Sequence, residues 1–207
     1  LGSATPTSIS ISGNVYTLGM NISGTPNGFE HITITPVNNS IYDATDNEAS
    51  TSQLMNQAYL HDKVGPSIAS TGSLGINNST VEVTFGEPVF NTSGGALETS
   101  DFTFGLSGGT ATGATVSSIS ISEITYTLGI TIAGIANGSE TLIVTPVANS
   151  IYDMAGNAAS TTQSNNTVSL LDGRIAIVTS HDHDTNYGKD NRIIRMDSDT
   201  YLLAYKG

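Results

Sequence analysis

The sequence predicts an all-β protein made of antiparallel β-sandwiches, and three features support that prediction. Apolar and polar residues alternate along several short stretches, as they do in strands with one buried face. Ser, Thr, Asn and Gly fill most of the remaining positions, a composition that suits short strands joined by turns. Part of the sequence also recurs after an interval of domain size, which indicates tandem modules.

The repeat aligns residues 8–62 with residues 118–172 without a gap, and about half of the paired positions are identical. Apolar positions stay apolar in both copies while the residues between them change, as expected for strands on a common core. The clearest run consists of Tyr126, Leu128, Ile130 and Ile132, matched by Tyr16, Leu18, Met20 and Ile22. An Asn-Gly pair follows this run in each copy, at Asn27 and Asn137, and predicts a tight turn before the next strand.

The second copy has a front half that the first copy lacks. Its expected strands lie at residues 80–85, 102–106, 116–121, 124–132 and 141–145, with one at its opening near Ile68 and one after the Asp153 turn. These make about seven strands, the number in an immunoglobulin-like sandwich. The sequence therefore predicts a complete immunoglobulin-like domain at residues 62–172 and the C-terminal half of another at residues 1–61.

Residues 173–207 match neither copy and carry most of the cationic side chains. Three short apolar runs, at residues 174–178, 192–196 and 201–205, predict a C-terminal β-strand extension or the start of a further domain.

An isolated half-sandwich leaves its inner face in water, at a loss of roughly 1.5–3 kcal/mol for each large apolar side chain. It also leaves open sheet edges, which invite pairing. Residues 1–61 are therefore expected to need a partner. Two explanations stay open: the chain is a piece of a longer protein, or the missing strands come from the tail by strand addition, in the same chain or from a neighbouring subunit.

The charge balance excludes several classes of partner. The formal net charge is −12 with only six Lys and Arg residues, so the chain lacks the basic surface that nucleic acid or an anionic membrane requires. No apolar run is long enough to span a membrane, and there is no cysteine for a disulfide or a thiolate metal site. No export signal begins at Leu1, so we expect any such signal to lie outside these residues.

The acidic turns are the candidate metal sites, and Ca²⁺ is the ion they suit, although no cofactor is required by the fold. Asp153 and Asn157 close a turn, and Glu87 adds a third side chain with the hard oxygen ligands that Ca²⁺ prefers. The first copy has Asp43 and Asp46 at the matching turn. The alternative is structural, because Asp and Asn accept backbone N–H groups in tight turns and glycine permits a positive φ there.

A second acidic cluster lies in the tail. Asp182 and Asp184 have the spacing of a calcium loop, but the glycine and the final glutamate of an EF-hand are missing from their positions. His181 and His183 would share one face of a strand and suit a transition metal. A solvated loop between strands is the structural alternative.

The sequence predicts no enzyme. It has no cysteine nucleophile, no Gly-x-Ser-x-Gly elbow and no Gly-rich phosphate loop with a lysine. Tyr16, Tyr126, Tyr42 and Tyr152 recur in register within strand-like patterns, which favours core or corner positions over a sugar-stacking platform.

Two motifs mark the complete copy after its opening Gly65-Pro66. They are Phe85-Gly86-Glu87-Pro88-Val89 in the second strand and Asp153-Met154-Ala155-Gly156-Asn157 near the end. With these motifs the domain resembles the bacterial immunoglobulin-like modules of S-layer and large adhesin-type surface proteins. The first copy departs at its turn, where Thr45-Asp46-Asn47 stands and the glycine is lost. The resemblance implies a module that serves as a spacer, a stalk, an adhesin or an enzyme appendage.

We therefore expect a structural repeat module of an extracellular or cell-surface prokaryotic protein, part of a stalk or filament that assembles by β-strand complementation between subunits. Its expected partners are further copies or neighbouring modules of the same protein. Two alternatives stay open: an adhesin module that binds a glycan or a surface protein, and an accessory domain of a large secreted hydrolase.

Overall fold

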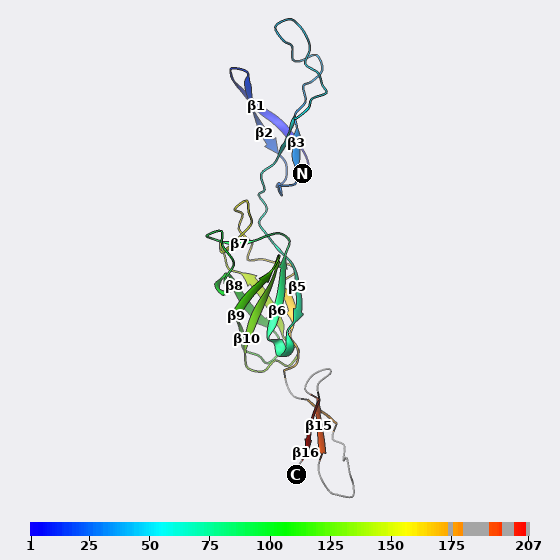
Figure 1. Cartoon of the computed structure of the whole chain (residues 1–207), viewed down its shortest axis with the longest axis vertical. Helices are drawn as coiled ribbons and strands as arrows, with labels where there is room; N and C mark the ends of the chain where they lie inside the picture. The colour runs from blue at the N-terminus through cyan, green and yellow to red at the C-terminus, as the bar shows by residue number, and fades with distance from the viewer. Residues whose placement is uncertain (174–175, 180–190, 196–200, 206–207) are drawn as a thin grey trace.

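The computed structural model describes residues 1–173, 176–179, 191–195 and 201–205, and within them the chain is all-β, as predicted (Figure 1). Helical structure in these residues is limited to short 3₁₀ turns at Ile76–Asn78 and Thr99–Asp101. Over the same residues, no helix has the length and apolar character needed to cross a membrane. The first repeat copy and the complete sandwich follow one another along the long axis of the molecule (Figure 1).

The complete sandwich combines a four-stranded sheet with a three-stranded sheet. The four-stranded sheet has the order β5-β6-β10-β9, the three-stranded sheet has the order β13-β11-β8, and a short pair, β12–β7, lies beside them. The strands are β5 (Ile68–Leu74), β6 (Thr80–Phe85), β7 (Phe90–Asn91), β8 (Phe102–Ser107), β9 (Gly113–Ser122), β10 (Thr125–Ala133), β11 (Thr141–Pro146), β12 (Ile151–Tyr152) and β13 (Thr167–Ser169). Seven of these nine strands occur where the sequence predicts them, whereas the short strands β7 and β12 were not predicted. The predicted sandwich is confirmed.

Alternation along the strands builds the core of this sandwich. In β6 the side chains of Val81, Val83 and Phe85 are fully buried, while Glu82 between them is exposed. The ring of Phe85 meets that of Tyr126 edge-on, with centroids 5.8 Å apart and an interplanar angle of 89°. Phe102, from the other sheet, lies 6.3 Å from each of these rings. These aromatic contacts join the two sheets at the centre of the core.

The first copy forms two separate strand pairs. β1 (Ala4–Ser12) pairs with β2 (Val15–Ile22), and β3 (His31–Thr33) pairs with β4 (Gln57–Tyr59). In the sandwich, the equivalent strands β10 and β11 each have a second neighbour, β6 and β8 respectively. The described core cluster lies entirely between Ile68 and Leu170, so the first copy has strands and turns but no closed core.

The C-terminal strands β14 (Ala176–Thr179), β15 (Asn191–Arg195) and β16 (Tyr201–Tyr205) agree with the three predicted runs. They form one antiparallel sheet in the order β14-β15-β16, and its described ladders involve only these strands. The described strands of the tail therefore do not pair with the first copy of the same chain. That version of the complementation hypothesis is not supported by the described strands.

Candidate metal centre between the repeat copies

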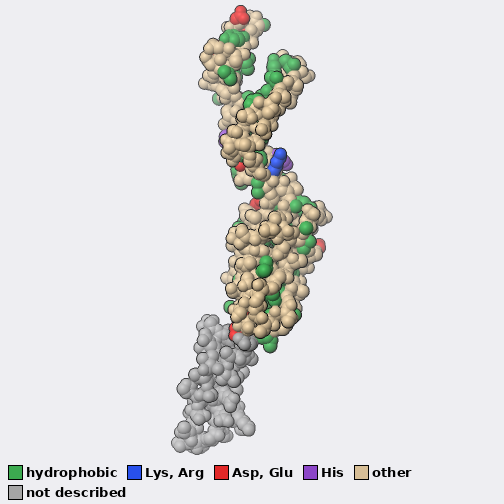
Figure 2. Space-filling view, turned by 180° about the vertical axis from the view of Figure 1, so that it is seen from behind, with side chains coloured by type: hydrophobic (Ala, Val, Ile, Leu, Met, Phe, Trp, Pro, Cys, Tyr) green, Lys and Arg blue, Asp and Glu red, His purple; other side chains and the backbone are tan. Residues whose placement is uncertain are grey.

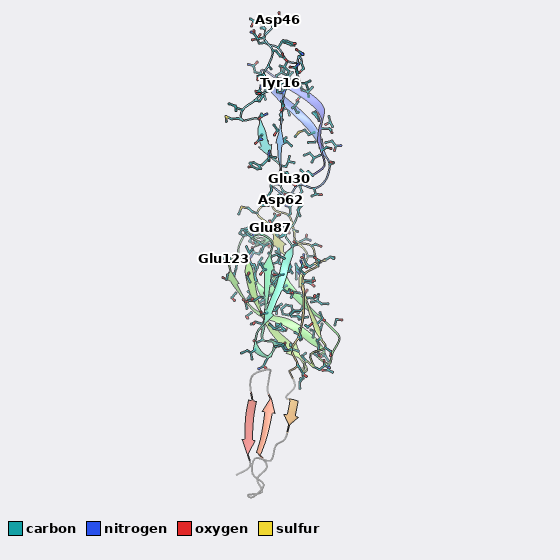
Figure 3. All side chains as sticks on the ribbon, turned by 90° about the vertical axis from the view of Figure 1, so that its right-hand side faces the viewer. Tyr16, Glu30, Asp46, Asp62, Glu87 and Glu123 are labelled. Carbon is teal, nitrogen blue, oxygen red and sulfur yellow. The ribbon has the colours of Figure 1, made fainter. Side chains whose placement is uncertain are left out.

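Three carboxylates converge where the first copy meets the sandwich. Asp62 lies in the linker after β4, Glu87 lies in the loop after β6, and Asp153 follows β12. One oxygen from each carboxylate can be chosen so that all three lie within 4.8 Å of one another. Figure 3 shows Asp62 and Glu87 next to each other at this joint.

The turn after β12 holds Asp153 in place. Its side chain is only 4% exposed, and its two oxygens accept hydrogen bonds from the backbone N–H and the side-chain amide of Asn157, both at 2.8 Å. The backbone N–H of Asp153 donates to the carbonyl of Asn157 at 3.1 Å, and Gly156 has a φ of 88°. The structural interpretation of this turn is therefore correct, and the turn also fixes one carboxylate of the cluster.

The linker is fastened to the same turn. The side-chain amide of Asn157 donates to the backbone carbonyl of Asp62 at 3.3 Å, and the N–H of Val64 donates to the Asp62 carboxylate at 2.8 Å. A Cβ atom at Gly65 would lie 2.1 Å from the carbonyl oxygen of Ala158. Only glycine permits the linker backbone to approach the turn this closely, so Asp62 is brought to the cluster by the path of the chain.

The electrostatics of the cluster are unfavourable without a positive charge. Partial burial raises the pKa of Glu87, and the negative charges of Asp153 and Asp62 raise it further. Like-charged carboxylates in one site are relieved either by taking up a proton or by binding a cation.

The geometry fits a hard divalent cation. Two oxygens bound to one Ca²⁺ at about 2.4 Å lie at most about 4.8 Å apart, the limit within which the three carboxylates fall. Asp62, Glu87 and Asp153 would be the ligands. The amide nitrogen of Asn157 would orient the Asp153 carboxylate and hold the backbone carbonyl of Asp62. Ca²⁺ takes six to eight oxygens, so water and backbone carbonyls would supply the rest.

The sequence identified part of this cluster. Glu87, Asp153 and Asn157 were predicted together, and the structure brings them together. Asp62 was not predicted as a ligand, because a linker carboxylate has no pattern that marks where it will lie in space. The signal that could have found it is the Gly65-Pro66 pair, which brings the linker against the turn.

The turn of the first copy repeats the local bonds but not the cluster. Hydrogen bonds from the side chain and backbone of Asn47, and then from Thr45, lower the pKa of Asp43. Asp46 has a φ of 64° in the position of the glycine of the second copy, a conformation that Asp tolerates better than most residues. Neither Asp43 nor Asp46 belongs to a group of three acidic residues in the described part of the chain. Asp182 and Asp184 lie outside the described residues.

A shallow hollow of about 450 Å³ adjoins this cluster. It is lined by Phe90, Asn91, Thr92, Gly94, Tyr152, Asp153, Met154 and Gly156. Phe90 and Tyr152 are direct partners on the paired strands β7 and β12, and the Tyr152 hydroxyl donates to the carbonyl of Asn149 at 3.1 Å. Two half-buried aromatic rings therefore stand beside the polar turn.

Comparison of the chain with protein-family models, with curated proteins and with solved structures gives no match.

Proposed function

We propose that this chain is a structural repeat module of an extracellular prokaryotic surface protein, in which immunoglobulin-like units are joined into a stalk or filament. The motifs by which the sandwich resembles S-layer and adhesin-type modules support this proposal, as does the end-to-end order of the two copies (Figure 1). The observation that carries it is the joint, where the linker carboxylate of Asp62 meets Glu87 and Asp153 of the sandwich.

A cation at this joint would act mechanically. Asp62 belongs to the linker, whereas Glu87 and Asp153 belong to the sandwich, so one ion bound by all three ties the linker to the module. Without the ion, repulsion among the carboxylates opposes this contact. Ca²⁺ would thus stiffen the joint and set the angle between successive modules, and assembly would continue through strand complementation between subunits.

Calcium titration of the full chain tests this function. We expect one site with a Kd of roughly 10⁻⁴–10⁻³ M, the range of extracellular modules, and a longer, narrower particle by small-angle X-ray scattering when calcium is bound. Asp62→Asn should weaken binding about tenfold or more, because it removes one of three ligand charges. Asp46→Asn is the matched control, since it removes the same charge from the turn of the first copy.

Equal calcium affinity in Asp62→Asn and Asp46→Asn would contradict a site at the joint. Scattering profiles that do not change on binding would contradict its mechanical role.

A second candidate function, glycan binding, is favoured by the hollow between Phe90 and Tyr152. Aromatic faces bind the apolar faces of sugar rings, and the neighbouring Thr92 could donate a hydrogen bond. Saturable binding to a glycan array that is lost in Tyr152→Ala but kept in Tyr42→Ala, the matching residue of the first copy, would support it. An array without signal excludes it.

A further inference from the structure

The first copy exposes the side chains that the second copy buries. Tyr16 is 61% exposed and its counterpart Tyr126 is 3% exposed, and Ile41 is 54% exposed where Ile151 is fully buried. Figure 2 shows hydrophobic side chains on the open surface of the first copy. The front half of the sandwich, residues 64–110, is what covers these positions in the second copy.

The free edge of β2 has the sequence of an inner strand. β1 and its counterpart β9 are outer strands, and β1 carries Pro6 and a register shift beside it, as protected edges often do. β2 contains neither proline nor any charged residue, and its counterpart β10 lies between β6 and β9. Natural edges usually carry such protection, so β2 is built to have a neighbour on both sides.

Among the residues that the structure describes, the side-chain carbonyl oxygen of Gln53 lacks the hydrogen-bond donor that its counterpart on Gln163 has in the sandwich. In the sandwich, the Gln163 carbonyl oxygen accepts the N–H of Ile68 at 2.8 Å. Gln53 keeps the matching bond from its amide nitrogen to the Ser50 carbonyl, but in the described residues its own carbonyl oxygen has no donor.

Glu30 gives a second, charged example. Its counterpart Glu140 accepts backbone N–H groups from Thr110, Ala111 and Asn137, whereas Glu30 is bonded to Asn27 in the described part of the chain. Ala111 and Asn137 correspond to Leu1 and Asn27 of the first copy, so a front half would add the remaining donor, the N–H equivalent to that of Thr110. This bond to a charged acceptor is one that a front-half segment would supply.

A second copy of residues 1–207 does not supply this segment. The chain holds one front half and two back halves, and its front half is already paired with β10 and β11. The tail strands form a single sheet, whereas β5 and β6 belong to one sheet of the sandwich and β8 to the other. The tail therefore has a different arrangement from the one that is missing.

We propose that residues 1–61 are an acceptor for the front half of another repeat of the same type, contributed by polypeptide outside residues 1–207. The donor strand equivalent to β6 pairs antiparallel with the free edge of β2, in the register that β6 has on β10. The donor positions equivalent to Thr84, Val83, Glu82, Val81 and Thr80 then lie opposite Val15, Tyr16, Thr17, Leu18 and Gly19. This surface deepens the assembly part of the proposed function and rests on it.

A fusion tests the acceptor directly. Residues 64–110 are placed immediately before Leu1 of the full chain, because the repeat makes Leu1 the counterpart of Ala111. Hydrogen exchange is measured in the presence of a chelator. The result then does not depend on whether calcium binds at the joint between the copies. We expect the amides of β2 to exchange at least about 100-fold more slowly than in the unfused chain, as those of an internal strand do, and the fusion to be a monomer.

The matched control carries Val81→Lys and Val83→Lys in the added segment only, and should leave β2 unprotected. The amides of β6 and β11 in the resident sandwich report that every variant is folded. Equal protection by the Lys-substituted donor, or no protection by the native donor, overturns the proposal. Concentration-dependent protection of β2 in the unfused chain also overturns it, because a second copy would then be the occupant.

Discussion

The two repeat copies place nearly the same residues in opposite environments. Leu142 and Val144 are fully buried in β11, whereas Ile34, the counterpart of Val144, is 46% exposed. β3 has three residues and ends before Ile34, whereas β11 has six residues and contains Val144. Burial in this molecule is therefore not a property of the repeated sequence itself. Burial depends on whether the front half of the sandwich is present to cover the repeated side chains.

The register of the hairpin and the backbone angles of the Asn-Gly turn, in contrast, are the same in both copies. Ile11 pairs with Tyr16 just as Ile121 pairs with Tyr126, and each hairpin has its register shift at the matching position. The glycines of the Asn-Gly turns have φ values of 82° at Gly28 and 81° at Gly138. Turns and hairpins thus depend on short-range hydrogen bonds and backbone preferences, which do not need the core.

The largest difference between the copies should appear when the paired tyrosines are truncated. Tyr126→Ala removes a buried ring that contacts Phe85 and Phe102, and should lower the free energy of unfolding of the sandwich by about 3 kcal/mol or more. Tyr16→Ala removes an exposed ring and should change it by less than about 0.5 kcal/mol. Urea unfolding followed by NMR signals of the sandwich measures both values. A comparable loss in the two variants would show that the copies do not differ in this way.

Substitution of the paired glutamates Glu140 and Glu30 should change the stability of the sandwich by less than truncation of the tyrosines does, but again unequally. Desolvation opposes ionisation of Glu140, but the N–H groups of Ala111, Thr110 and Asn137 outweigh it and lower its pKa to about 2. A depressed pKa adds stability above the ordinary value of 4.5, and this stability is lost as the pH falls towards 2. Glu140→Gln should therefore lower the melting temperature clearly at pH 7 and hardly at all near pH 2.

Glu30→Gln is the matched control, because it keeps a single described partner, Asn27. Its melting curve for the sandwich should overlay that of the parent chain at both pH values. A shift as large as that of Glu140→Gln would mean that the carboxylate acts through net charge and not through the loop it binds.

The comparison between the two copies also shows which features of the structure can be predicted from the sequence. Period-two alternation predicted the strands, because alternate side chains of a strand lie on opposite faces. The repeat predicted that the first copy lacks its front half, and the exposure of Tyr16 agrees with that prediction. The candidate metal centre was predicted only in part. Asp62 joins Glu87 and Asp153 because Gly65 passes against Ala158, and a contact of this kind depends on tertiary packing that no local pattern encodes.

The smallest expected change in the free energy of unfolding is that of Glu87→Gln, and its sign depends on whether calcium is present. The pKa of Glu87 is raised, so the folded state binds its proton more tightly than the unfolded state does. Stability is then lost as the pH rises from below the ordinary value of 4.5 through the raised pKa, and at neutral pH the charge is a cost. In chelator at pH 7, Glu87→Gln should raise the free energy of unfolding by about 0.5 kcal/mol, a small value because solvent screens this partly exposed group.

In millimolar calcium Glu87→Gln should be less stable than the parent chain, because the variant has lost a ligand and is stabilised less by the ion. Glu82→Gln is the matched control, since it makes the same change at an exposed position of β6 away from the cluster. Urea unfolding of the three proteins, each with calcium and with chelator, gives the comparison. If Glu87→Gln and Glu82→Gln respond alike to calcium, Glu87 is not a ligand. The difference between the two copies would then lie in their cores alone, and not also in an ion at the joint.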